Sequence, residues 1–163
     1  MVRCLGPHYC RLNRESCHPV TDADHYRKLE HLYVAAPISR WYGISVAISD
    51  GKAEVRLPVR PEFYHAANAV HGSVYFRALD DAAFFAANSR VREVLVLTVS
   101  FTVQFARPVM NGEIRAVGRL VHESGWLFMA ESDLFDEAGK LLARGSGVFT
   151  RSAIALDPSI GYA

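Results

Sequence analysis

The sequence predicts an α+β fold in which one antiparallel sheet wraps around one long central helix. Two observations support this prediction. Residues 72–87 contain no proline and no interior glycine, and apolar residues cover nearly the whole circumference of the helix they would form. On both sides of this segment, residues of alternating polarity recur between turn signals, as expected for strands. A helix that is apolar almost all round must be buried, and the apolar face of a single sheet can bury it.

The 163 residues divide into three predicted segments. Residues 1–20 are an N-terminal extension, residues 21–151 are one domain, and residues 152–163 are a short C-terminal tail. The extension contains all the cysteines of the chain, and their spacing matches no standard zinc pattern. Their odd number argues against a disulfide framework, so we expect neither a metal nor a disulfide here: Cys4, Cys10 and Cys17.

The domain begins with a predicted peripheral helix. Thr21 is a suitable N-cap and is followed by acidic residues, and tyrosines and leucines then recur at helical spacing as far as Pro37. We expect His25 and His31 on the solvent-facing side of this helix.

A β-hairpin is the next predicted element. Residues 43–49 and 53–59 have the composition of strands, and Asp50-Gly51 between them is a strong hairpin signal. Pro58 indicates an edge or the end of a strand. After a loop at 61–70 comes the central helix.

Four strands follow the helix and are expected to form an antiparallel meander: 94–106, 113–122, 126–135 and 140–150. In the first of them, strict alternation places Thr98 on one face together with Ser100, Thr102 and Gln104. The other face then carries the apolar side chains Leu97, Val99, Phe101, Val103 and Phe105. The edge strands of such a sheet favour edge-to-edge dimerisation.

The few polar residues of the central helix are informative. Arg77, Asp81 and Asn88 fall on one stripe, and the spacing of Arg77 and Asp81 predicts a solvated ion pair there. Asp80 points about 100° away from Asp81, among aromatic and alanine side chains, and has no partner in its own helix. It is either a structural acid bonded elsewhere or a carboxylate for acid–base chemistry.

Composition narrows the function classes. Half of the residues are hydrophobic and the formal net charge is +1, which gives no electrostatic reason to expect nucleic acid or an anionic membrane as a partner. No apolar run approaches the roughly 20 residues that span a bilayer, and the first residues do not resemble a signal peptide. We therefore expect a cytoplasmic protein.

One motif resembles that of a known family. His71-Gly72-Ser73 opens the helix, Asp80 stands nine residues after His71, and Phe105-Ala-Arg107-Pro108 ends the long strand. These residues resemble the hotdog-fold acyl-CoA thioesterases of the phenylacetate-degradation type, whose motif is His-Gly-Gly followed by an Asp at that distance. The resemblance covers roughly residues 40–151 and also includes the segments 136–140 and 147–150.

The resemblance implies roles for individual residues. Asp80 would be the general base or the nucleophile, and the backbone N–H of Gly72 would polarise the thioester carbonyl across a dimer interface. Thr98 stands where some relatives orient the attacking water, although it is equally suited to be an ordinary strand residue. His71 would either bond the loop into place or shuttle protons.

Two positions depart from the family motif. Ser73 replaces its second glycine. His65 stands where relatives commonly carry an asparagine, and it could donate to the carbonyl or be an ordinary loop residue.

The resemblance also predicts a substrate and its contacts. An acyl-CoA would place its acyl chain beside Phe76, Phe84 and Leu79, and surface arginines would meet the CoA phosphates: Arg90, Arg92 and Arg107. A homodimer or homotetramer without metal or cofactor is expected. Two alternatives stay open, namely a non-catalytic acyl-CoA sensor and a hotdog enoyl hydratase or dehydratase.

Overall fold

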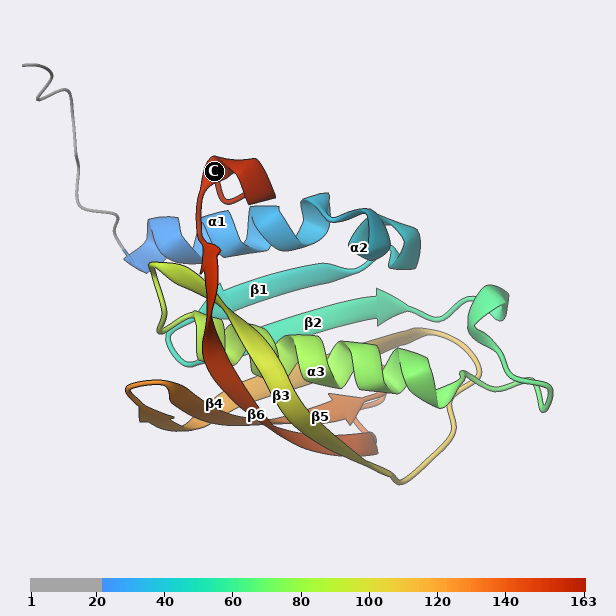
Figure 1. The fold of residues 1–163 in the computed structure, drawn as a ribbon. Helices are drawn as coiled ribbons and strands as arrows, with labels where there is room; N and C mark the ends of the chain where they lie inside the picture. Colours follow the sequence, from blue (N-terminus) through green and yellow to red (C-terminus); the bar gives the residue numbers. More distant parts are fainter. Residues whose placement is uncertain (1–21) are drawn as a thin grey trace, which may run out of the picture.

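The computed structural model describes residues 22–163, in which a six-stranded antiparallel sheet curves around one long helix, α3 (Figure 1). The predicted α+β class is therefore confirmed, whereas the cysteines of the extension and Thr21 lie outside the described residues. The helices are α1 (Asp22–Ala35), α2 (Pro37–Tyr42) and α3 (Gly72–Asn88), with short 3₁₀ turns η1 (Pro61–Phe63) and η2 (Pro158–Ile160). The strands are β1 (Ser45–Ser49), β2 (Lys52–Pro58), β3 (Val94–Phe105), β4 (Glu113–Ser124), β5 (Leu127–Phe135) and β6 (Leu141–Ala155).

The sheet order is β1-β2-β4-β5-β6-β3, which confirms the β1–β2 hairpin and corrects the predicted meander. β3 pairs with β6 at one edge of the sheet, and β4 pairs with β2 instead of with β3. The physical reason lies in the segment between β3 and β4, residues 106–112. Its backbone carbonyls accept from Val70 N–H and Val59 N–H, so the chain crosses to the far side of α3.

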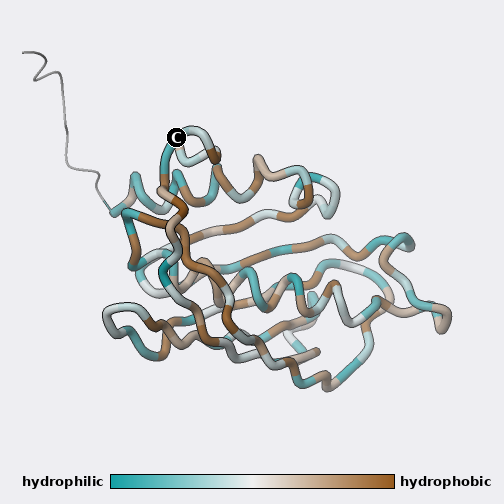
Figure 2. Tube along the Cα trace, in the orientation of Figure 1, coloured by the Kyte–Doolittle hydropathy of each residue, from teal (hydrophilic) through white to brown (hydrophobic). Residues whose placement is uncertain are grey.

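The core lies between α3 and the concave face of the sheet. In Figure 2, hydrophobic stretches lie along the strands that line this face. The helix and the sheet approach each other closely at Gly118 on β4, where an added Cβ would collide with the carbonyl oxygen of Ala82. The Ser132 hydroxyl donates to the Leu79 carbonyl at 2.8 Å and ties β5 to the middle of the helix. These two contacts help to fix the position of α3 relative to the sheet.

A β-bulge in β3 overturns the predicted alternation. Thr98 pairs with Phe149 and Ser100 pairs with the preceding residue of β6, so Val99 is an extra residue on β3. Because of this extra residue, Thr98 and Phe101 both face α3, and Val99 points outward with 62% of its surface exposed. Strict alternation had placed Thr98 on the opposite face from Phe101.

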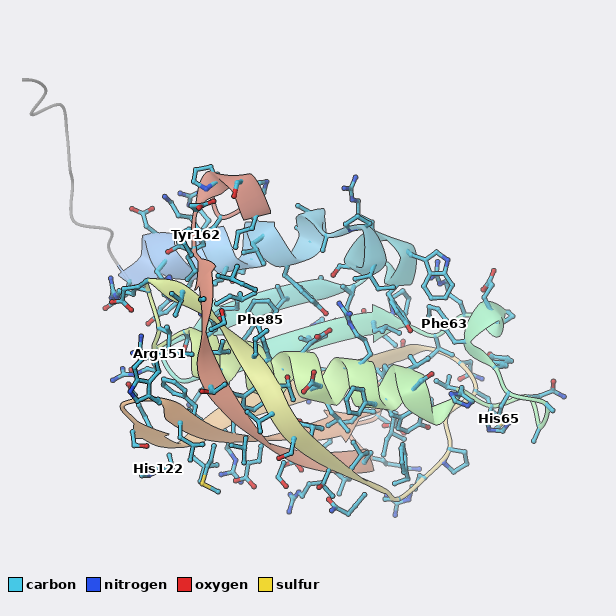
Figure 3. The ribbon with its side chains drawn as sticks, viewed as in Figure 1. Phe63, His65, Phe85, His122, Arg151 and Tyr162 are labelled. Atoms are coloured by element: carbon cyan, nitrogen blue, oxygen red, sulfur yellow. The ribbon has the colours of Figure 1, made fainter. Side chains whose placement is uncertain are left out.

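His25 on α1 is fully buried, so its predicted exposure was wrong. Its Nε2–H donates to the carbonyl of Asn88, and its Nδ1 accepts from the Tyr162 hydroxyl at 2.7 Å. Burial lowers the pKa of His25, in keeping with a neutral ring. Figure 3 shows Tyr162 beside α1, so residues 152–163 are more than a tail, because they continue β6 to Ala155 and then cover this histidine. His31, in contrast, is exposed as predicted.

The Arg77–Asp81 ion pair exists, but it is not the solvated pair that the sequence predicted. α1 and α2 cover it. The Tyr33 hydroxyl donates to Asp81, the Arg77 guanidinium lies over the rings of Tyr33 and Tyr42, and it donates to Ser39. Burial raises the pKa of Asp81 to about 6 despite the neighbouring guanidinium. The side of α3 that the sequence predicted to be solvated therefore anchors α1 and α2.

Within residues 22–163, no helix is both long enough and apolar enough to cross a bilayer.

Candidate functional site

The predicted site residues lie in two groups along α3. The first group surrounds its N-terminus. His71 is the N-cap residue, with an extended backbone, and its Nδ1 accepts from both the backbone N–H of Ser73 and the Ser73 hydroxyl, at 3.1 and 2.8 Å. The next N–H of the first turn, that of Val74, is bonded to the His71 carbonyl. Among the described residues nothing accepts from the N–H of Gly72, so one donor at the positive end of the helix dipole is unused.

A cleft of about 380 Å³ opens beside this unused donor. Its walls are mostly apolar, with a histidine and an arginine at the border: His65, Val70, Gly72, Tyr75, Phe105, Ala106, Arg107 and Pro108. Figure 3 shows His65 in the loop beyond the N-terminal end of α3. The Nδ1 of His65 accepts from the Ala67 N–H, so its Nε2 carries the proton of the neutral ring and is a donor. The cleft thus combines apolar walls with donors suited to an anionic oxygen.

The second group is Asp80 with Thr98. The Thr98 hydroxyl lies 3.2 and 3.4 Å from the two carboxylate oxygens of Asp80. Burial raises the pKa of Asp80, while the Thr98 hydroxyl and the Arg77 charge pull that pKa downward. Phe76, one turn nearer the N-terminus of α3, is exposed and packs edge-on against Phe101 at 5.7 Å between ring centroids. Asp80 is therefore a partly desolvated carboxylate with one hydrogen-bond donor among residues 22–163, a setting that suits a base.

The two groups do not meet within one chain. Gly72 and Asp80 are eight residues apart on the same straight element, which corresponds to about 12 Å along the axis at 1.5 Å per residue. Near Asp80, the surface carries several exposed apolar side chains: Phe76, Leu97 and Val99. They lie on α3 and on β3, whose outer edge is unpaired over its 12 residues in the described chain.

The remaining predicted residues have separate environments. Phe84 packs against Phe85 and Phe149 in the core, with part of its surface exposed. Two of the three arginines form surface ion pairs, Arg90 with Asp50 and Glu123, and Arg92 with Asp22. Arg107 alone lines the cleft.

Five cleft residues were not predicted as part of the site: Val70, Tyr75, Phe105, Ala106 and Pro108. The signal for Phe105 was its place in the Phe-Ala-Arg-Pro segment, whereas Tyr75 appeared only as one more apolar helix residue. In residues 22–163, no cluster of three or more histidine, cysteine or acidic side chains has a geometry that could hold a metal ion.

Comparison with known proteins agrees with this fold. Residues 67–143 match the family model of the thioesterase superfamily, a range that includes Gly72, Asp80, Thr98 and Arg107 but not His65. The fold superposes with a TM-score of 0.75 on the E. coli PaaI protein from the phenylacetic acid degradation operon, at 18% identity, over 82% of this chain and 97% of that one. For the conserved protein PA5202 from Pseudomonas aeruginosa the TM-score is 0.69 at 26% identity, over 74% and 97% of the two chains. The Saccharolobus solfataricus protein named "Putative esterase SSO2140" is 24% identical over 102 residues, which are 63% of this chain and 73% of that one.

Proposed function

We propose that this chain, whose residues 67–143 match the thioesterase superfamily and whose fold is similar to that of the E. coli PaaI protein, hydrolyses an acyl-CoA thioester to the free acid and CoA. The observation that carries this proposal is the unused N–H of Gly72. Gly72 is the first residue of the 17-residue helix α3, and it lines a mostly apolar cleft. Such a donor stabilises an oxyanion without reorganising, because the backbone and the helix dipole hold it in place. Acyl-CoA esters are intracellular metabolites, so the proposed activity belongs in the cytoplasm.

The proposed reaction divides the work between the two groups. The thioester carbonyl oxygen accepts from Gly72 N–H, and the Nε2–H of His65 is a second donor at the border of the cleft. Asp80, oriented by the Thr98 hydroxyl, takes a proton from water as that water attacks the carbonyl carbon, or attacks the carbon itself. In the second case CoA leaves first, and water then hydrolyses the mixed anhydride on Asp80 to give the free acid and restore the carboxylate. Collapse of the intermediate breaks the C–S bond, and the CoA thiolate leaves and takes up a proton. His71 supports this arrangement as the cap of the helix.

The distance between the groups requires a second subunit. A donor and a base that act on one carbonyl must each lie about 3 Å from the reacting atoms, which 12 Å along one helix does not permit. Two subunits related by a two-fold axis, with their β3 edges facing, would bring Asp80 of one chain near Gly72 of the other. The exposed apolar side chains around Asp80 support such an interface, within a homodimer or a homotetramer. Arg107, in the cleft, is then the arginine best placed for a CoA phosphate.

The test is free-thiol release from short, medium, long and aromatic acyl-CoAs, with one acyl carrier protein thioester for comparison. We expect kcat/KM of about 10⁴ M⁻¹ s⁻¹ or more for at least one acyl-CoA. Binding of acyl-CoA in a calorimeter without thiol release would support the sensor alternative instead. Hydration of an enoyl-CoA without thiol release would support the hydratase alternative.

Thr98→Val is expected to move the acid limb of the kcat/KM profile to higher pH. The hydroxyl lowers the pKa of Asp80 by bonding its ionised form, so removing the hydroxyl raises that pKa and a larger pH is needed to ionise the base. Thr98→Ser keeps the hydroxyl and is the matched control, whose profile should stay near that of the wild type. An unchanged profile in Thr98→Val would show that Thr98 is an ordinary strand residue.

A further inference from the structure

We propose that Phe105 is a specificity-determining residue, which restricts the cleft to acyl groups that are unbranched at the carbon next to the thioester carbonyl. This inference rests on the proposed function, because it assigns the carbonyl to the N–H of Gly72. It deepens that function by naming the class of acyl group that the site accepts.

The ring of Phe105 lies over Gly72. A Cβ added at Gly72 would lie 3.1 and 3.3 Å from two carbon atoms of this ring, which is closer than nearly all contacts that real Cβ atoms make. A carbonyl oxygen bonded to the Gly72 N–H would lie about 2.9 Å from that nitrogen. Because Gly72 and Phe105 line the same cleft, we place the carbon that follows the carbonyl in the space that the ring of Phe105 borders.

The neighbours of Phe105 in the cleft are held in place by other contacts. Tyr75 is buried, its ring packs edge-on against Phe105 at 5.7 Å between centroids, and its hydroxyl donates to the carbonyl of Arg107 at 3.1 Å. The backbone after Phe105 is also held, because the N–H groups of Ala106 and Arg107 both donate to the Leu142 carbonyl. A substituent on the substrate cannot displace Tyr75 without breaking these contacts.

The Phe105 side chain itself is 58% exposed within one chain, so it contributes little to the core of that chain. Because the large ring of Phe105 lies next to the unused N–H of Gly72, it can discriminate between substrates of different shape. An unbranched acyl chain can pass beside the ring, whereas a methyl branch next to the carbonyl overlaps it.

The experiment compares butyryl-CoA with isobutyryl-CoA, which have the same atoms and differ only in branching. Wild type is expected to prefer the unbranched isomer in kcat/KM by about tenfold or more, within the range that one methyl group gives in a close-fitting site. Phe105→Ala should reduce this ratio at least severalfold, with Phe105→Leu in between. Trp126→Ala, which removes an aromatic side chain at the exposed tip of the β4–β5 hairpin, is the control and should keep the wild-type ratio.

A merely structural role for Phe105 would lower the rates for both isomers equally and leave the ratio unchanged, which would overturn the proposal. Binding of the same two isomers, measured by calorimetry in Asp80→Asn, gives the ratio without turnover. If wild type hydrolyses neither isomer nor any other acyl-CoA, the proposed function fails. The binding ratio in wild type and Phe105→Ala then still decides whether Phe105 selects against branching.

Discussion

Asp80→Asn is expected to lower kcat for thioester hydrolysis by about a thousandfold, because asparagine can neither accept the proton of water nor attack the carbonyl. The variant should fold as well as the wild type. Asparagine has nearly the same shape, and its side-chain oxygen can still accept from the Thr98 hydroxyl. The loss is to be measured by thiol release at saturating substrate, with thermal unfolding followed in parallel.

The thermal midpoint of Asp80→Asn should equal or exceed that of the wild type at neutral pH. Burial raises the pKa of Asp80, which means that the folded protein favours the uncharged form more than the unfolded chain does. Replacing the charge with a neutral amide therefore removes a cost of folding. A fully active Asp80→Asn would sink the catalytic assignment, while an inactive but unfolded variant would contradict this account of the burial.

Subunit mixing with a second variant tests where the site is formed. Gly72→Pro removes the N–H at the first position of a helix, where proline is well tolerated, and the extended backbone of His71 suits a following proline. Gly72→Ala adds the same Cβ but keeps the N–H, so it is the matched control for the contact with Phe105.

Gly72→Pro and Asp80→Asn should each be inactive alone. Random mixing of the two should restore about a quarter of the wild-type activity, since half of the dimers are mixed and each of these has one intact site of two. No recovery, in dimers shown to exchange subunits, would place each site within a single chain.

Arg77→Met is expected to destabilise the protein by about 3 kcal/mol at pH 8, because it leaves the buried carboxylate of Asp81 without its cation. The sign of the pH dependence follows from the raised pKa of Asp81. The folded state holds this proton up to about pH 6, whereas the unfolded chain loses it near pH 4, so stability falls as pH rises between these values. Removing Arg77 raises this pKa further and extends the loss to higher pH.

The measurement is chemical denaturation of wild type, Arg77→Met and the double variant Arg77→Met/Asp81→Asn at pH 5 and pH 8. Near pH 5, Asp81 is protonated and the effect of Arg77→Met should be smaller than at pH 8. The double variant has no carboxylate at position 81 and should recover most of the loss at pH 8. The groups that face Asp81 are Tyr33, Arg77 and the neighbouring Asp80, whose pKa the Arg77 charge also lowers, so the double variant isolates the part of the effect that acts through Asp81. An equal loss at both pH values would show that Arg77 acts through packing alone.

Local patterns predicted the elements of this fold well. The nearly all-apolar segment after His71 is α3, and Asp50-Gly51 forms the β1–β2 hairpin, because both depend on neighbours in sequence. The distinction between Asp80 and Asp81 also followed from helix geometry. The structure gives Asp80 a partner from β3 and Asp81 partners from α1 and α3.

Features that depend on distant segments were not predictable in the same way. The charged stripe at Arg77 and Asp81 looks solvated until α1 and α2 cover it, and nothing in the helix itself indicates that cover. The burial of His25 depends on Tyr162, 137 residues away. The pairing of β3 with β6 depends on the crossing segment 106–112, whose hydrogen bonds reach two separate parts of the chain.

The bulge at Val99 lets both ends of β3 contribute side chains to the proposed site. Between Thr98 and Phe101 the extra residue reverses which side chains of β3 point toward α3. One continuous strand therefore directs the Thr98 hydroxyl to the Asp80 carboxylate and the Phe105 ring to the cleft. Strict alternation would place Thr98 and Phe105 on opposite faces of the strand. With the extra residue between them, the end that we propose to orient the base and the end that we propose to select substrates both face the site.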